Sequence, residues 1–405
     1  MIAQDIVRTV DFPKERRIGP SGRLRKIRCA DNRLARARAI SWIVRAKIAR
    51  DPAPTGARSN VSIERLRLIR PDDWHLHVRD GAMLDSVVPD TARQFARAII
   101  MPNLKPPVTT VAQALHYRQR ILAALPEDAG FQPLMTLYLT GQTSPEEIRR
   151  AADCEHVYAV KYYPAGATTN SAAGVANIRQ ASAALKAMQD CRLPLLMHGE
   201  VTDPAVDVFD REAVFIERDL SWLLASFPEL PMVLEHITTA DSASFVRSGP
   251  DNLAATITAH HLLENRNAMF RGGLRPHHYC LPVLKREAHR QALIEAAISG
   301  HPRFFLGTDS APHPKAAKES DCGCAGIYTA RTALGLYAEV FEAAGALDRL
   351  EGFASLHGPD FYRLPRNTDT IELVRRPEPV PELIEFGGQP GVPFRAGGEV
   401  RWRLA

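Results

Sequence analysis

The sequence predicts an α/β protein built as a (β/α)8 TIM barrel. Eight short apolar runs follow one another along the chain, and stretches with helical periodicity separate most of them. Imidazole and charged side chains stand where several of these runs end, which is where barrel enzymes carry their active sites. A doubly wound open sheet shares this alternation, but the sequence has neither GxGxxG after a first strand nor GxxxxGK[ST].

The predicted strands are short and apolar, as buried parallel strands are. They comprise Leu66–Ile69, Ala98–Met101, Leu134–Leu139, Val157–Tyr162, Leu195–His198, Val233–His236, Leu253–Thr258 and Arg303–Gly307. The predicted helices comprise Val111–Leu125, Pro145–Ala152, Val175–Asp190, Arg211–Ala225, Ala240–Arg247, Lys285–Ser299 and Ala330–Ala344. The C-terminal segment is rich in Pro and Gly, which predicts loops around short strands such as Ile371–Val374.

The composition is that of an ordinary globular protein, with 45% hydrophobic and 24% charged residues. A chain of 405 residues can bury a substantial core, which excludes the disordered and collagen-like classes. No run of 18 or more apolar residues is present, so the sequence predicts no membrane span. Six cysteines in a chain of this length form no disulfide framework, and we expect a reduced, cytoplasmic protein.

Residues 1–60 differ from the rest of the chain. They hold 15 Lys and Arg against 5 Asp and Glu, a balance of +10, so residues 61–405 sum to −5 within the total of +5. We interpret residues 1–60 as a basic, poorly ordered extension, or as the product of a start codon assigned too far upstream. Residues 61–405 would form the barrel domain. A basic arm that binds acidic surfaces is an alternative. An organelle transit peptide is another, but such peptides are usually poor in acidic residues, and this segment contains Asp5, Asp11, Glu15 and Asp31.

Candidate metal ligands stand at the ends of five predicted strands. The first run continues into His75 and His77, which project to the same face of an extended chain. The other strand-end candidates are Lys161, His198, His236 and Asp309. A single strand-end histidine is more often a satisfied polar residue, but six candidates would converge on one barrel rim. Imidazole and carboxylate ligands suit zinc, and the set predicts a two-metal site.

Lys161 needs a partner or a modification, because a lone ammonium is costly to bury. Addition of CO₂ would turn its amine into a carboxylate that can bridge two cations.

Longer motifs surround these residues. They are Arg70–Asp80, Met101–Leu104, Pro106–Thr110, Lys161–Asn170, His198–Val201, Glu235–Thr239 and Gly307–His313. The chain resembles the amidohydrolase superfamily in its ligand pattern. In these motifs it resembles the short, monofunctional, bacterial-type dihydroorotase family, over roughly Ile63 to Arg403.

The resemblance implies a reversible, zinc-dependent reaction, in which N-carbamoyl-L-aspartate cyclises to L-dihydroorotate and water. This is the third step of de novo pyrimidine (UMP) biosynthesis. Each subunit would hold two Zn²⁺ bridged by N6-carboxylysine at Lys161. His75, His77 and Asp309 would bind one zinc, and His198 and His236 the other. Asp309 would also act as general base and then general acid.

The resemblance also implies a substrate site. Arg79, Asn103 and His313 would bind the substrate carboxylate, which suits the fork of a guanidinium. Backbone groups of Leu281 and Ala325 would address the ring. The flexible loop at Thr168 and Thr169 would close over the substrate. The family is commonly homodimeric, so we expect a homodimer with a small-molecule substrate and no nucleic-acid or membrane partner.

Several other residues have weaker interpretations. Glu200 follows His198 by two residues, and we expect it to orient a neighbouring ligand. Cys322 and Cys324 lack the CxxC spacing of a zinc site, and we expect their loop to position Ala325. The pairs His260-His261 and His277-His278 have no partner pattern that makes them ligands.

Three alternatives remain open at this point. Another cyclic amidohydrolase, such as a hydantoinase or allantoinase, would act on substrates without this exocyclic carboxylate. A catalytically inactive scaffold would be expected to lose ligands, and this chain keeps all six. A nucleic-acid or membrane-surface binder would depend on the basic residues 1–60.

Overall fold

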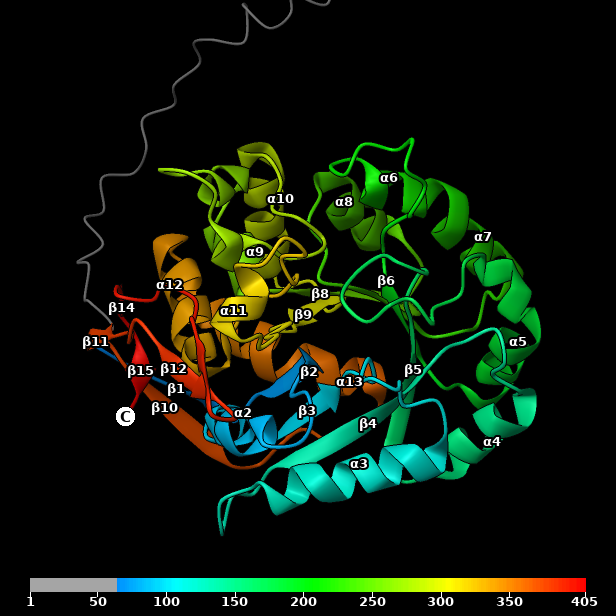
Figure 1. Ribbon diagram of the computed structural model, residues 1–405, viewed down its shortest axis with the longest axis horizontal. Helices are drawn as coiled ribbons and strands as arrows, with labels where there is room; N and C mark the ends of the chain where they lie inside the picture. Colours follow the sequence, from blue (N-terminus) through cyan, green and yellow to red (C-terminus); the bar gives the residue numbers. More distant parts are fainter. Residues whose placement is uncertain (1–63) are drawn as a thin grey trace, which may run out of the picture. The chain divides into compact units, whose positions relative to one another are not determined.

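Eight parallel strands form a barrel in which each strand pairs with the next along the chain from β2 to β9 (Figure 1). The computed structural model describes residues 64–405, so the predictions for residues 1–60 lie outside the described residues. The barrel strands are β2 (Asp72–Leu76), β3 (Arg97–Ile100), β4 (Gln132–Tyr138), β5 (Val157–Tyr162), β6 (Leu195–His198), β7 (Met232–Glu235), β8 (Leu253–Ile257) and β9 (Phe304–Leu306). The predicted fold class is therefore confirmed.

Helices between the strands surround the barrel (Figure 1). Those that correspond to predicted helices are α3 (Val111–Ala123), α4 (Pro145–Asp153), α5 (Ser182–Cys191), α6 (Arg211–Phe215), α7 (Ser221–Ser226), α8 (Ala240–Ser248), α10 (Glu287–Ile298) and α12 (Ala333–Ala343). The stretch predicted as one helix over Arg211–Ala225 is α6 and α7 joined by a π-helical segment, Ile216–Leu220. Four further helices were not predicted: α2 (Met83–Ala92), α9 (Ala259–Leu263), α11 (Lys315–Lys318) and α13 (His357–Tyr362).

The prediction of Leu66–Ile69 as the first barrel strand was wrong. This segment is β1 (Arg65–Ile69), which pairs antiparallel with β10 (Thr370–Val374) in a separate three-stranded sheet that also contains β15 (Arg403–Leu404). Its apolar pattern correctly indicates a strand, but does not reveal which partner it pairs with. The barrel begins one strand later, at β2, which itself contains His75.

The barrel is closed at its end opposite the site by α13. The Trp74 indole of β2 stacks on Tyr362 with ring centroids 4.4 Å apart, and Phe305 of β9 packs edge-on at 6.2 Å. Gly358 brings the α13 backbone so close that a Cβ there would lie 1.9 Å from the Trp74 Nε1 atom. Trp74 and Phe305 belong to a cluster of buried apolar side chains to which every barrel strand contributes, so a packed core lies beneath the site.

Hydrogen bonds join β2 to the chain that follows β9. The Asp73 carboxylate accepts from the Thr308 amide at 2.8 Å and from its hydroxyl at 2.5 Å. Beyond it, the Asp309 amide donates to the carbonyl of His75 at 2.8 Å, and the His77 amide donates to Ser310 at 3.1 Å. The barrel therefore closes at the point where three of the predicted ligands leave their strands.

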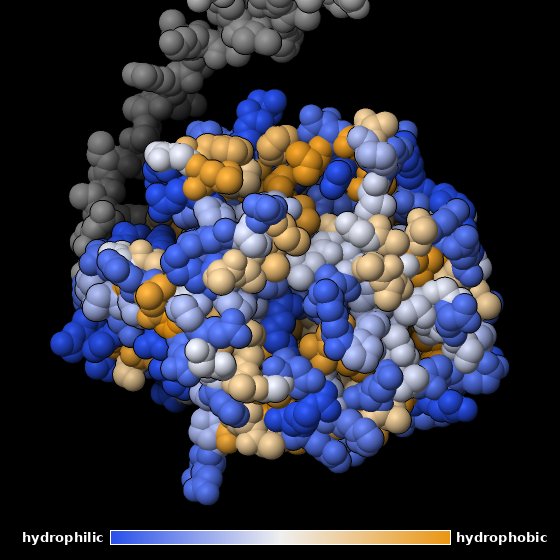
Figure 2. Space-filling model, viewed as in Figure 1, coloured by the Kyte–Doolittle hydropathy of each residue, from blue (hydrophilic) through white to orange (hydrophobic). Residues whose placement is uncertain are grey.

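The face seen in Figure 2 is mostly hydrophilic, and its hydrophobic residues gather in small groups, of which the largest lies over α9 and α10. Among residues 64–405, the large hydrophobic side chains that are exposed are Phe270, Leu274 and Leu383. No helix in this part of the chain combines the length and the apolar character needed to cross a bilayer.

Candidate active site

All the side chains predicted as metal ligands lie at the C-terminal end of the barrel and are at most 7% exposed. Each stands at or just beyond a barrel strand: His75 and His77 at β2, Lys161 at β5, His198 at β6, His236 after β7 and Asp309 after β9. Parallel strands bring these ends to one rim, which is why residues far apart in sequence meet there.

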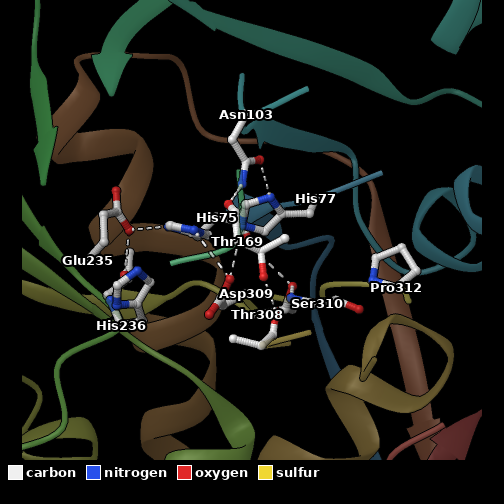
Figure 3. Close-up of polar contacts among 12 residues, drawn as sticks. His75, His77, Asn103, Thr169, Glu235, His236, Thr308, Asp309, Ser310 and Pro312 are labelled. Atoms are coloured by element: carbon white, nitrogen blue, oxygen red, sulfur yellow. Dashed lines mark hydrogen bonds and ion pairs between the residues drawn. The ribbon is translucent and has the colours of Figure 1, made fainter. Parts of the chain in front are cut away.

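Asp309 faces both histidines of the first barrel strand (Figure 3). Its Oδ1 atom lies 3.2 Å from His77 Nε2 and 3.4 Å from His75 Nε2. The ring of His236 lies 4.8 Å from that of His75 and 4.9 Å from that of His198, measured between centroids. Five of the six candidates thus share one small centre.

His236 and Asp309 have an uncommon backbone conformation. Their φ angles are 41° and 45°, in the left-handed region that residues with a side chain rarely adopt. Hydrogen bonds hold both: the His236 amide donates to Thr256 Oγ1 at 2.7 Å, and the Asp309 amide donates to the His75 carbonyl at 2.8 Å. Such strain persists where the surroundings enforce it, and here it lies at two of the candidate ligands.

Partners outside the centre fix the tautomer of three rings. The pairs are His75 Nδ1 with Glu235 Oε2 at 2.8 Å, His77 Nδ1 with Asn103 Oδ1 at 2.9 Å, and His198 Nε2 with Glu200 Oε2 at 2.7 Å. These oxygens accept hydrogen bonds, so the ring nitrogen in each pair carries the hydrogen. The other nitrogen of each ring keeps its lone pair for a metal ion.

Sequence reasoning missed Glu235 and Thr256 as members of the site. Glu235 lies within one of the motifs, but nothing in the sequence shows that its carboxylate reaches His75 on another strand. Thr256 Oγ1 donates to Glu235 Oε2 at 2.6 Å, so one hydroxyl supports both Glu235 and the His236 amide. The expected contact between Glu200 and a neighbouring ligand is present, with His198.

The centre has the chemistry of a metal site. Burial lowers the pKa of His75, His77 and His236 well below the usual value, so these rings are neutral near pH 7, as metal ligands must be. Burial also lowers the pKa of Lys161 to about 8. Among the described residues, neither Lys161 Nζ nor His236 Nδ1 has a hydrogen-bond partner. Unpartnered buried polar atoms beside nitrogen and carboxylate donors fit a bound metal centre.

A pocket opens onto these residues and includes most of the predicted substrate-binding groups. It is lined by His75, His77, Arg79, Asn103, Tyr163, Thr168, Thr169, His198, His236, Leu281, Asp309, Ala311, Ala325 and Gly326. Lys161 and His313 do not line it; Lys161 is fully buried, and its Nζ atom lies 5.0 Å from the centroid of the Tyr163 ring. Tyr163 is a pocket residue that the sequence analysis did not single out.

Arg79 is a cation held in place by the backbone. Its φ is 60°, its carbonyl accepts from the Tyr117 hydroxyl, and its Nε donates to the Pro312 carbonyl at 3.1 Å. Its terminal nitrogen lies 2.8 Å from Nε2 of His313, whose pKa burial lowers to about 2. In the part of the chain that the structure describes, Arg79 forms no ion pair with Asp or Glu, so its charge is available to an anion.

Asn103 connects the metal side of the pocket with the predicted loop. While its Oδ1 accepts from His77, its Nδ2 donates to the Thr169 carbonyl at 3.0 Å. Thr169 Oγ1 in turn donates to the Ala325 carbonyl at 3.3 Å. The loop therefore lies against the opposite wall of the pocket.

Two other histidines and one cysteine form a second buried group. His260 and His261 of α9 lie beside Cys280, all three buried. His261 is already satisfied, because its Nδ1 lies 2.8 Å from Thr258 Oγ1 and its Nε2 lies 3.0 Å from the Pro282 carbonyl. His277 contacts Glu319 at 2.9 Å, away from the pocket residues.

Comparison with known proteins agrees with this geometry. The model of the amidohydrolase family matches residues 68–373. A dihydroorotase of Nitrosococcus oceani is 63% identical over 343 residues, which cover 85% of this chain and 99% of that protein. The solved dihydroorotase of Campylobacter jejuni is 36% identical with a TM-score of 0.77, covering 84% of this chain and 97% of the other. The dihydroorotase of Saccharomyces cerevisiae, solved with 5-fluoroorotic acid, is 34% identical with a TM-score of 0.78, covering 85% and 99%. The chain therefore belongs to the amidohydrolase family and, within it, to the dihydroorotases.

Proposed function

We propose that this enzyme interconverts N-carbamoyl-L-aspartate and L-dihydroorotate at the pocket described above. The observation that carries the proposal is that five of the six candidate metal ligands line one pocket together with Arg79, which forms no ion pair with Asp or Glu among the described residues. The substrate is a small anion with a cyclic amide, so it needs a cation for its carboxylate and a Lewis acid for its carbonyl.

The proposed metal centre has two zinc ions. His75, His77 and Asp309 would bind one, and His198 and His236 the other. Lys161, carboxylated to N6-carboxylysine, would bridge them. The fixed tautomers of the rings and the unpartnered Lys161 amine support these roles. Such a centre would activate a water molecule and polarise the ring carbonyl.

The protein groups would position the substrate and move its proton. Arg79 would bind the carboxylate through its fork, with Asn103 and His313 beside it. The backbones of Leu281 and Ala325 would address the ring. Asp309 would take a proton from the attacking water and deliver it to the leaving ring nitrogen.

The loop that carries Thr168 and Thr169 would close over the substrate and exclude water.

The direct test is hydrolysis of L-dihydroorotate by the purified protein, supplied with zinc and bicarbonate. We expect turnover that exceeds the rate on hydantoin, which lacks the carboxylate that Arg79 would bind. A faster rate on hydantoin would move the assignment to another cyclic amidohydrolase. Absence of turnover by folded, zinc-loaded protein would contradict the proposal.

We further propose that the protein is a homodimer in the cytoplasm. Within residues 64–405, the dimer is supported by Phe270 and Leu274, which are 60% and 78% exposed on one short segment, as contact residues of a dimer often are. Light scattering coupled to size-exclusion chromatography measures the mass directly, and a monomer at micromolar concentration would contradict the proposal.

A further inference from the structure

Lys318 is a buried lysine whose ammonium group binds backbone carbonyls. It stands at the end of the short helix α11 and is 4% exposed. Its Nζ donates to the carbonyls of Tyr279 at 2.7 Å, Cys324 at 2.8 Å and Gly326 at 2.7 Å. Three hydrogens of one ammonium therefore meet three acceptors, and no ion pair among the described residues includes Lys318.

These carbonyls belong to the two backbone segments that form one wall of the pocket. Tyr279 lies two residues before Leu281, and Cys324 and Gly326 flank Ala325, while Leu281, Ala325 and Gly326 all line the pocket. The Gly326 amide donates to the Tyr279 carbonyl at 3.1 Å, so the segments also contact each other directly. Lys318 thus links the two pieces of main chain that would address the substrate ring.

The wall has little room to move. Gly326 has a φ of 148°, and a Cβ added there would lie 2.8 Å from Ala311 Cβ and 2.9 Å from His313 Cδ2. The Ala325 carbonyl also accepts from Thr169 Oγ1 at 3.3 Å. A shift of this segment would therefore reach His313 and the Thr169 loop as well as the ring contacts.

The charge of Lys318 also reaches the end of the pocket where the carboxylate would bind. Burial is the largest cause of the low pKa of His313, and the positive charges of Arg79 and Lys318 lower it further. A desolvated, fixed cation of this kind favours an anion nearby.

We propose that Lys318 is a positioning residue for substrate recognition. Its ammonium sets the spacing and orientation of the Leu281 and Ala325 backbones, and places a fixed positive charge behind the substrate carboxylate. This role rests on the proposed function, and Lys318 would act on the substrate through the main chain that it binds.

The test compares Lys318→Met with Lys315→Met in zinc-loaded, full-length protein. Methionine has nearly the same length as lysine but can neither donate to the carbonyls nor carry a charge. Lys315 lies on the same helix, and its side chain is 41% exposed and paired with Glu319. For Lys318→Met we expect the KM for L-dihydroorotate to rise by roughly tenfold or more. The kcat should stay within about threefold, because contacts to the ring stabilise the ground state and the transition state alike. The zinc content should not change. Inhibition by 5-fluoroorotate should weaken in parallel, and Lys315→Met should match the unmodified enzyme.

A second variant, Lys318→Arg, keeps the test decisive if Lys318→Met fails to fold. Lys318→Arg keeps the charge, but its flat, larger head cannot serve three acceptors around one point, so KM should still rise by about threefold or more. Unchanged KM and inhibition in either folded variant would overturn the positioning role, as would failure of both variants to fold, since Lys318 would then serve the fold as a whole. Inactivity of the unmodified enzyme would instead contradict the proposed function.

Discussion

The single residues of the centre owe their orientation to neighbours that would not touch the metal. Glu235 contacts His75, and Asn103 contacts His77, each through the ring nitrogen that points away from the centre. A carboxylate partner also makes an imidazole a better donor to a cation. We therefore expect the affinity for metal to depend on residues outside the proposed ligand set.

Glu235→Gln should weaken zinc binding by roughly 10–100-fold, because the ring of His75 would lose its anionic partner. Competition with a chromophoric chelator measures this affinity. The exposed Glu229 offers a matched control, and Glu229→Gln should bind zinc as the unmodified protein does. Equal zinc affinity in the two variants would contradict the role of Glu235.

Lys161→Ala should remove the proposed bridge. We expect loss of most bound metal and at least roughly a 100-fold loss of turnover, because two-metal catalysis depends on both ions. Added short carboxylates such as propionate should restore part of the activity by supplying the missing oxygens. Metal analysis and the rate on L-dihydroorotate measure these effects. Full activity with normal zinc content would contradict the proposed bridge.

At the scale of elements, the ends of the barrel strands carry the candidate site residues, and α13 closes the opposite end of the barrel. Left-handed residues just after β7 and β9 turn His236 and Asp309 toward the centre. At the other end, α13 packs against Trp74 through Gly358. Because Trp74 directly precedes His75, packing at the bottom of the barrel also holds the strand that carries the first ligands.

Gly358→Ala should destabilise the protein by about 1–3 kcal/mol, the usual cost of overpacking, since the new methyl group would collide with the indole. Thermal or urea unfolding measures the change. Gly141→Ala is the control, because a Cβ at Gly141 would meet no atom within 4 Å. Equal stability of the two variants would show that α13 shifts freely and would contradict the tight contact.

The sequence predicted these elements to different degrees, for physical reasons. Buried parallel strands are continuous apolar runs, so seven barrel strands were recognised within a few residues. Helix α2 was not, because Pro89 lies inside it. The strand ends indicated the six candidate ligands, whose role as ligands stays a prediction. Glu235 and Lys318 were not recognised, because their contacts with His75 and with backbone carbonyls leave no pattern in the sequence. Backbone φ values are likewise invisible in a sequence without glycine at those positions.

At the scale of the whole molecule, the proposed chemistry is confined to the barrel. The pocket residues run from His75 to Gly326, all within the described residues. The basic character of the chain comes from residues 1–60, which hold a balance of +10. We therefore expect catalysis to be independent of the basic segment.

A protein that begins at Ser62 should keep kcat/KM for L-dihydroorotate within about twofold of the full chain, since it retains every group proposed to contact substrate or metal. Steady-state kinetics on both proteins, with equal zinc content, provides the comparison. A large loss of activity in the shorter protein, with its fold intact, would show that residues 1–61 take part in the site.

The pairing of β1 with β10 has a consequence for how the chain is made. The ribosome releases β1 before any barrel strand, whereas β10 follows the last of them, so β1 waits through nearly the whole of translation for its partner. A chain cut short just before Thr370 would contain every barrel strand and every pocket residue, yet would leave β1 with an open edge. Incomplete translation products of this protein should therefore be prone to aggregate even when their barrel is complete.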